Sequence, residues 1–149
     1  MNYEIILFDV DDTLFDFDKS EKKALHKTFS EFEYPSGLLD YRGTYNEISK
    51  ILWSDLEQGS ITLSEIAIER FTRLFLKHEL DINAEIFSRV YLEYLGRETL
   101  PVQGAIELCE KLVDYRLAII TNGFTTVQTA RIENSDLRNT FEHIIMSEE

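Results

Sequence analysis

The sequence predicts an α/β protein, in which an incomplete Rossmann-like parallel sheet of about three strands carries an all-helical cap inserted after strand 1. Three observations support this. Short apolar runs without polar alternation occur near the N-terminus and in the last third of the 149 residues, as expected for strands of a parallel sheet. Helical periodicity fills the long interval between them. The last third then alternates helix with strand, which favours right-handed βαβ connections.

The first apolar run comprises residues 4–9, Glu-Ile-Ile-Leu-Phe-Asp. Its lack of alternation predicts a strand that is buried on both faces. The run ends in an acidic cluster, Asp-Val-Asp-Asp-Thr, at residues 9–13. We therefore expect a core formed by residues 1–15 and 98–149, with the helical cap at residues 16–97.

Four helices are predicted between residues 18 and 97. Asp18 and Thr62 are each followed three residues later by Glu, which is the pattern of a capping box at a helix N-terminus. Asn83 is a candidate cap for the last of the four. Between the helices that start near Asp18 and Thr62, apolar residues at helical spacing predict a further helix from about Gly43 to Leu56.

The last third of the chain predicts two further helices and two strands. Apolar residues at helical spacing indicate helices at Gly104–Asp114 and at about Thr125–Ile132. The short apolar runs Leu117–Ile120 and His143–Met146 indicate the second and third strands. Together with the first strand they give a βαβαβ order.

Composition excludes several classes of function. A net charge of −13 argues against nucleic acid as a partner, because such proteins need a basic face. The sequence has no apolar run near the roughly 20 residues of a membrane helix, and its N-terminus does not resemble a signal peptide. The single cysteine, Cys109, cannot form an internal disulfide, so a reduced, cytoplasmic location is expected. A phosphorylated substrate would require a bound cation to reverse the local field.

Polar residues follow the first two predicted strands: Asp9 and Asp11 after one, Thr121 and Asn122 after the other. Ligands of open parallel sheets gather beyond the carboxyl ends of the strands. Phosphoryl transfer can use a carboxylate nucleophile, a second carboxyl group as acid and base, and donors for the phosphoryl oxygens. The two aspartates, with the hydroxyl and amide groups, match these requirements.

These residues resemble the motifs of the haloacid dehalogenase superfamily. Residues 9–14, Asp-Val-Asp-Asp-Thr-Leu, resemble its first motif, and residues 119–123, Ile-Ile-Thr-Asn-Gly, resemble its second. The helical segment between them is placed and sized like the cap of that superfamily.

The resemblance implies an activity and a role for each residue. Asp9 would be the nucleophile and a Mg²⁺ ligand, and Asp11 the acid/base, with its main-chain carbonyl on Mg²⁺. Thr121 would bind the phosphoryl group, with Asn122 close by. The implied reaction is magnesium-dependent hydrolysis of a small phosphate ester through an aspartyl phosphate. Within the superfamily the sequence resembles the intracellular pyrimidine-nucleotide phosphatases, which makes a nucleoside monophosphate one candidate for the substrate.

Two parts of the superfamily pattern have no counterpart here. Its later motifs supply a lysine and an acidic pair, whereas no lysine follows Lys111 and Asp136 is the only aspartate after Thr121. We therefore expect a truncated copy or a fragment of a longer parent. In the superfamily the first strand lies in mid-sheet, so strand 5–8 would form a bare edge here and favour self-association.

Other interpretations remain open. The chain could be an inactive fragment that keeps only half a site. It could also be a receiver domain that accepts a phosphoryl group, although the residues after the third strand, Met-Ser-Glu at 146–148, contain no aspartate. Aromatic residues at helical spacing in the cap, including Trp53, Tyr91 and Tyr94, could contact a nucleobase but are more often core.

Overall fold

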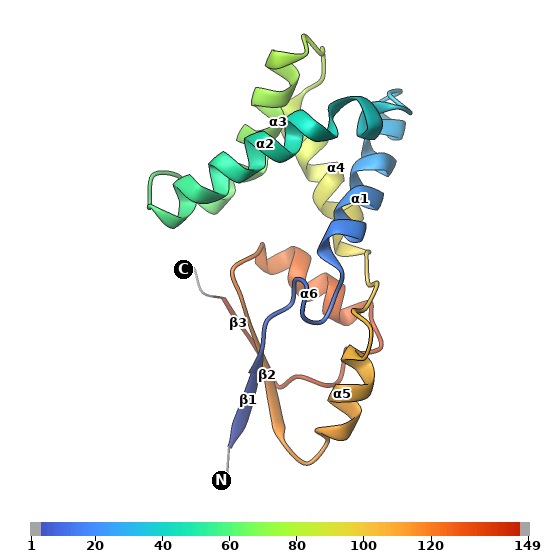
Figure 1. The fold of residues 1–149 in the computed structure, drawn as a ribbon, viewed down its shortest axis with the longest axis vertical. Coiled ribbons are helices and arrows are strands. Elements are labelled where there is room, and N and C mark those ends of the chain that lie inside the picture. Colours follow the sequence, from blue (N-terminus) through green and yellow to red (C-terminus); the bar gives the residue numbers. More distant parts are fainter. Residues whose placement is uncertain (1–3, 147–149) are drawn as a thin grey trace. The chain divides into compact units, whose positions relative to one another are not determined.

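The computed structural model describes residues 4–146 and divides into two compact units. Unit 1 consists of Met1–Lys23 with Leu95–Glu149, and unit 2 is Ala24–Tyr94. Along the chain the elements are β1 (Ile5–Phe8), α1 (Phe17–Glu31), α2 (Gly37–Glu57), α3 (Leu63–Lys77), α4 (Ala84–Gly96), α5 (Ala105–Lys111), β2 (Arg116–Thr121), α6 (Thr125–Glu133) and β3 (His143–Met146) (Figure 1). The predicted α/β class, with a helical insertion after strand 1, is confirmed.

The sheet of unit 1 has three parallel strands in the order β1-β2-β3. Phe8 pairs with Ile119 across the first ladder, and Ile120 pairs with Ile145 across the second. Because all three strands run in the same direction, their carboxyl ends meet at one edge of the sheet. The chain segments that follow β1 and β2 therefore start side by side.

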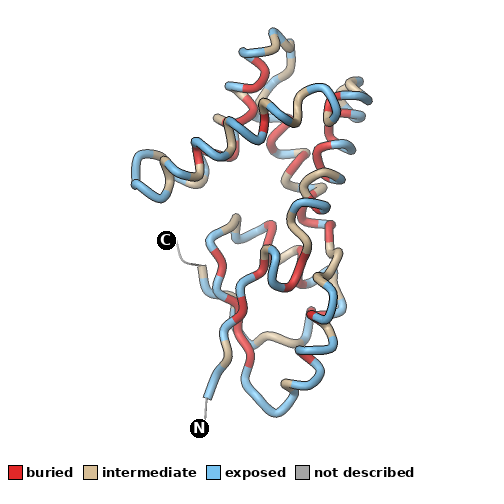
Figure 2. Tube along the Cα trace, viewed as in Figure 1, coloured by how far each residue is buried: buried red, intermediate tan, exposed pale blue. Residues whose placement is uncertain are grey.

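One face of this sheet forms the core of unit 1. Side chains from β1 and β2, the loop after β1, helices α5 and α6 and the segment after α6 form one buried cluster: Phe8, Val10, Leu14, Phe15, Ala105, Cys109, Leu117, Ile119, Ile132 and Leu137. Figure 2 shows where buried positions lie along the backbone. Burial raises the pKa of the Cys109 thiol, since a thiolate would be poorly solvated there. Cys109 is therefore an uncharged packing residue.

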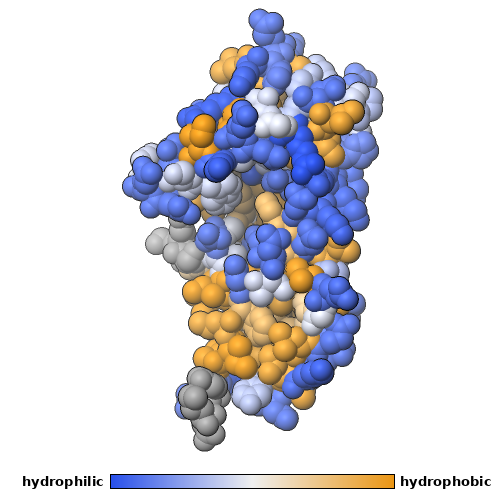
Figure 3. Space-filling model, viewed as in Figure 1, coloured by the Kyte–Doolittle hydropathy of each residue, from blue (hydrophilic) through white to orange (hydrophobic). Residues whose placement is uncertain are grey.

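The opposite face of the sheet is open among the described residues, contrary to the expectation that strand 4–9 is buried on both faces. Ile5, Leu7, Ile120 and Ile145 remain 37–49% exposed, and apolar side chains gather over the strands in Figure 3. The reason is topological. Strands added in the order β1-β2-β3 by right-handed crossovers place both connecting helices on the same face. Within residues 4–146, β1 pairs with β2 and with no other strand. Self-association through the edge formed by β1 stays a prediction, which light scattering can test.

Unit 2 has an aromatic core of its own. Phe71 lies 4.8 Å from Phe87 and 5.4 Å from Tyr91 between ring centroids, and 5.6 Å from Tyr45. Tyr91 has no exposed surface, which makes it a packing residue and not a surface for a nucleobase. The hydroxyl of Tyr94 donates a 2.6 Å hydrogen bond to Glu31.

The helix caps confirm two predictions and correct a third. Thr62 forms the predicted capping box at α3, and Asn83 accepts a 3.0 Å hydrogen bond from the amide of Ile86 at α4. At α1, however, the carboxylate of Asp16 accepts the amide of Lys19 at 3.0 Å, so the helix begins before the predicted cap, Asp18.

None of the helices in residues 4–146 is long and apolar enough to cross a membrane. Residues 147–149, which include the Ser and Glu that follow the third strand, lie outside the described residues.

Two glycines of α2 provide a test of the packing in unit 2. A Cβ atom on Gly37 would lie 2.4 Å from the ring of Phe29, whereas one on Gly43 would meet nothing within 4 Å. We expect Gly37→Ala to lower the free energy of unfolding by about 1–3 kcal/mol through overpacking. Gly43→Ala should raise it by up to about 1 kcal/mol, because alanine favours a helix interior. Urea unfolding followed by circular dichroism measures both, and equal effects would contradict this packing.

Candidate functional site

The loop after β1 starts at an exposed carboxylate. Asp9 is exposed, and its Oδ1 atom accepts a 2.8 Å hydrogen bond from the amide of Val10. Val10 is fully buried, and its carbonyl accepts the amides of Leu14 and Phe15 at 2.9 and 3.1 Å. The loop is therefore anchored directly behind Asp9, while the Asp9 side chain remains accessible.

Asp12 shapes the turn that follows. Its φ of 61° is left-handed, a conformation that Asp tolerates better than most residues because its side chain can bond the local backbone. The Asp12 amide donates to the carbonyl of Phe15 at 2.8 Å, and its carboxylate accepts the amide of Phe17 at 3.2 Å. The turn thus has its own hydrogen bonds and leaves the Asp11 side chain free for other partners.

The end of β2 presents the Thr121 hydroxyl. Thr121 is 2% exposed, and its oxygen accepts hydrogen bonds from the amide of Gly123 at 3.3 Å and from Nε2 of Gln128 at 3.2 Å. A hydroxyl has two acceptor sites and one donor, so the O–H of Thr121 is left to donate. The next residue, Asn122, is exposed.

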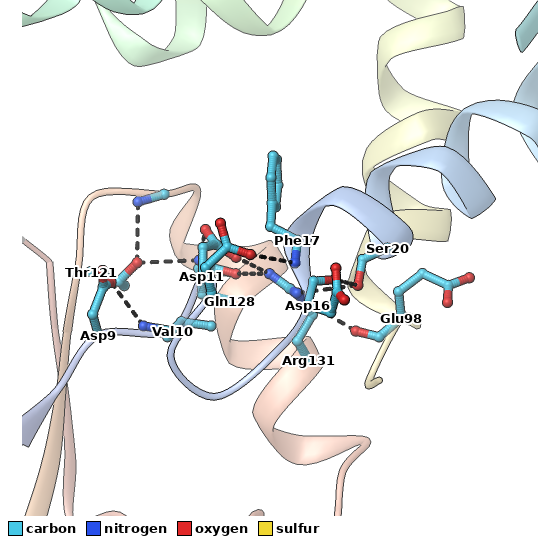
Figure 4. Close-up of polar contacts among 12 residues, drawn as sticks. Asp9, Val10, Asp11, Asp16, Phe17, Ser20, Glu98, Thr121, Gln128 and Arg131 are labelled. Carbon is cyan, nitrogen blue, oxygen red and sulfur yellow. Dashed lines mark hydrogen bonds and ion pairs between the residues drawn. The ribbon is translucent and has the colours of Figure 1, made fainter. Parts of the chain in front are cut away.

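Gln128 joins the two strand ends. Its Nε2 atom donates to Asp11 Oδ2 at 3.1 Å as well as to Thr121 (Figure 4). Its Oε1 atom accepts from the guanidinium of Arg131 at 3.0 Å, and this fixes the amide orientation because arginine can only donate. Gly123 makes room for this amide, since a Cβ atom there would lie 2.8 Å from Nε2.

The strongest contact of the site is an ion pair. Nη1 of Arg131 lies 2.6 Å from Oδ1 of Asp11, whose side chain is 31% exposed, whereas Arg131 itself is fully buried. The guanidinium carbon also lies 5.1 Å from the ring centroid of Phe15, which is close enough for a cation–π interaction. A buried charge requires such partners, because its transfer from water is unfavourable.

The structure thus brings together two of the four predicted residues, Asp11 and Thr121, through one amide. Asp9 directly follows β1 and Asn122 directly follows β2, and both residues are exposed. Sequence analysis missed Gln128 and Arg131. The available signal was weak: the two polar residues lie one turn apart in a helix, next to the apolar Val127 and Ile132.

The available donors are of the kind that magnesium binds. They are carboxylate and carbonyl oxygens, the ligand type that hard cations prefer. The carboxylate of Asp11 is engaged by Arg131 and Gln128, which leaves its main-chain carbonyl for a metal. Within residues 4–146, no group of three or more His, Cys, Asp or Glu could hold a metal ion. A magnesium ion here would therefore rely on water and substrate oxygens for much of its coordination.

Comparison with known proteins gives a family and several relatives. Residues 3–149 match the family model for haloacid dehalogenase-like hydrolases. The whole chain is 35% identical to the pyrimidine 5′-nucleotidase PynA of Streptococcus pneumoniae, of which it covers 63%. It is 29% identical to the pyrimidine 5′-nucleotidase YjjG of Escherichia coli, of which it covers 64%. The chain thus spans less than two thirds of the length of these relatives.

Solved structures agree with this family. The magnesium-bound crystal structure of the HAD-hydrolase YfnB from Bacillus subtilis superposes with a TM-score of 0.90 at 31% identity, covering 99% of this chain and 66% of that one. The L-2-haloacid dehalogenase of Xanthobacter autotrophicus shares the fold, with a TM-score of 0.67 at 19% identity over 97% of this chain and 57% of that one.

The ion pair between the buried Arg131 and the partly exposed Asp11 should show coupling in a double-mutant cycle. Asp11→Asn leaves the Arg131 guanidinium without its counter-charge, so we expect the free energy of unfolding to fall by about 1–3 kcal/mol. In an Arg131→Met background the same change should have a much smaller effect. Urea unfolding of the four proteins measures the coupling.

The matched control is the ion pair of Arg116 with Glu142, whose side chains are 58% and 42% exposed. Arg116→Met with Glu142→Gln should show weaker coupling, since water screens exposed pairs. Equal coupling in the two cycles would contradict the burial of Arg131.

Proposed function

Because the chain belongs to the haloacid dehalogenase-like hydrolases, we propose that its site hydrolyses a small phosphate monoester through a phosphoryl group carried on Asp9. One observation carries the proposal. The carboxylate of Asp11 and the hydroxyl of Thr121, from two different strand ends, share the buried amide of Gln128. Such an arrangement offers an acid/base and an oxygen-binding donor beside an exposed carboxylate.

In the first step, a carboxylate oxygen of Asp9 attacks phosphorus as the bond from phosphorus to the ester oxygen breaks. Asp11 takes up a proton before this step, at an acceptor site that Arg131 and Gln128 leave open, and gives it to the leaving oxygen, which departs as an alcohol. The free O–H of Thr121 donates to a phosphoryl oxygen and steadies the negative charge there. The exposure of Asp9 supports this role, because the nucleophile must meet the substrate.

In the second step, water attacks phosphorus and the bond from phosphorus to Asp9 breaks. Asp11 takes the proton that the water loses and so returns to its starting state. The products are inorganic phosphate and the original Asp9 carboxylate. One ester and one water are thus converted into one alcohol and one phosphate.

We assign a magnesium ion to the carboxylate of Asp9 and the main-chain carbonyl of Asp11. When bound, magnesium neutralises charge between a carboxylate nucleophile and a phosphate dianion. The type of donor supports this assignment, and YfnB, a relative at 31% identity, was solved bound to magnesium. The orientation of the Asp11 carboxylate toward Arg131 fits a ligand role for its main chain and not its side chain.

The proposed substrate is a nucleoside monophosphate, because two relatives are named pyrimidine 5′-nucleotidases. We also propose that residues 16–97 form the cap, which selects among leaving groups. Small-molecule esters remain the expected partners, and nucleic acid is not expected for a chain with a net charge of −13. A competing proposal is an inactive half-site, favoured by the lack of a third metal-binding carboxylate within residues 4–146.

Phosphate release from a panel of phosphate monoesters, with uridine 5′-monophosphate included, tests the proposal. Release should require magnesium and stop when a chelator is added. Asp9→Asn should reduce it at least about 1,000-fold, because the nucleophile is lost. Asp114→Asn is the matched control: Asp114 is exposed in the turn before β2, so its substitution should leave release unchanged.

Two other outcomes would count against the proposal. Equal release by wild type and Asp9→Asn would exclude the aspartyl phosphate. Absence of release from a folded sample on every ester would favour the half-site for this chain.

A further inference from the structure

Helix α6 carries two polar residues that lie within the core of unit 1. Gln128 is 2% exposed and Arg131 has no exposed surface. They lie three residues apart, so both project from the same side of the helix. Packing alone does not account for them, since an apolar residue would fill the same volume without loss of hydration. Their contacts indicate a more specific role.

Both oxygens of the Asp11 carboxylate are held by this pair. Oδ1 accepts from Nη1 of Arg131 at 2.6 Å, and Oδ2 accepts from Nε2 of Gln128 at 3.1 Å (Figure 4). Two donors on different oxygens fix the rotation of the carboxylate as well as its position. Each carboxylate oxygen has a second acceptor site, so the group can still exchange a proton with substrate or water.

The holding groups are themselves fixed. Nε of Arg131 donates to the main-chain carbonyl of Glu98 at 3.1 Å, and Nη2 makes a long 3.5 Å contact with the hydroxyl of Ser20. Nη1 also donates to Gln128 at 3.0 Å. The guanidinium plane is therefore tied to segments well separated in the sequence. Lysine could supply the charge but not these directed contacts.

We infer that Arg131 and Gln128 are positioning residues, which hold the Asp11 carboxylate where it protonates the leaving group. This inference rests on the acid/base role proposed for Asp11. Arg131 lies inside the protein with no exposed surface and acts on the substrate only through Asp11. Its loss should thus impair the step that needs an acid and spare reactions that do not.

Leaving groups of different basicity separate such a role from a general structural one. The alkoxide of uridine 5′-monophosphate needs a proton as it leaves, whereas the nitrophenolate of p-nitrophenyl phosphate leaves without one. Arg131→Met should lower kcat/KM for the nucleotide about 100-fold, within the range for acid catalysis, and kcat/KM for the nitrophenyl ester no more than about threefold. The comparison uses kcat/KM because this quantity reports the first step alone, whereas Asp11 acts as the base in the second step for both esters. Gln128→Met should change the ratio of the two kcat/KM values, nucleotide to nitrophenyl ester, in the same direction. Arg131→Lys should recover part of the activity on the nucleotide that Arg131→Met loses.

Two control comparisons make this result decisive. Arg116→Met removes an exposed ion pair and should leave the ratio unchanged. In an Asp11→Asn background, Arg131→Met should change the ratio no further, because the two residues act as one unit. Equal losses on both esters in folded Arg131→Met and Gln128→Met would overturn the inference.

Hydrogen exchange provides a readout that needs no turnover. The amides of Leu14 and Phe15 are bonded to the carbonyl of Val10, in the loop that Arg131 holds through Asp11. Arg131→Met should speed their exchange about tenfold or more, with β2 amides unchanged. If wild type releases no phosphate, the proposed function fails for this chain, and exchange alone decides the positioning role. Unchanged loop exchange in Arg131→Met would overturn that role.

Discussion

The buried guanidinium of Arg131 is the constraint on which the rest of the site depends. A cation without exposed surface is tolerated only if its donors and charge are met within the protein. Asp11 supplies the opposite charge, and Gln128 and the Glu98 carbonyl accept further hydrogen bonds. Because these partners come from separate parts of the chain, a shift of any one of them would leave the charge unsatisfied. The ion pair therefore fixes the loop after β1 against helix α6.

The sheet topology makes this arrangement possible and also explains the open face of unit 1. Right-handed crossovers in the order β1-β2-β3 bring α6 to the same face as α5, where its side chains reach the end of β1. Gly123 then lets the Gln128 amide approach the strand end, since a Cβ atom would lie 2.8 Å from it. The same topology leaves Leu7 and Ile145 exposed on the other face.

The sequence predicted those features that depend on short-range patterns. Apolar runs located all three strands, and the capping box at Thr62 marked the start of α3. The sequence misplaced the cap of α1, because Asp16 and Asp18 both fit a helix start, and in the structure it is Asp16 that accepts the amide of Lys19. The sequence could not predict the open face of the sheet, since a continuous apolar run is compatible with a strand that is covered on one face or on both. Arg131 was not identified from the sequence, because its partner Asp11 is 120 positions away.

The ion pair also bears on how an acidic chain could bind a phosphate ester. Arg131 is the cation joined to the site by hydrogen bonds, but it has no exposed surface and its charge is balanced by Asp11. It therefore cannot neutralise an incoming phosphate. The carboxylate of Asp9 is exposed and repels that phosphate at short range. A divalent cation beside Asp9 would offset this repulsion without disturbing the Arg131 pair. In the proposed mechanism these are two separate tasks: the fixed guanidinium would orient the acid, and a metal ion would neutralise the charge beside the nucleophile.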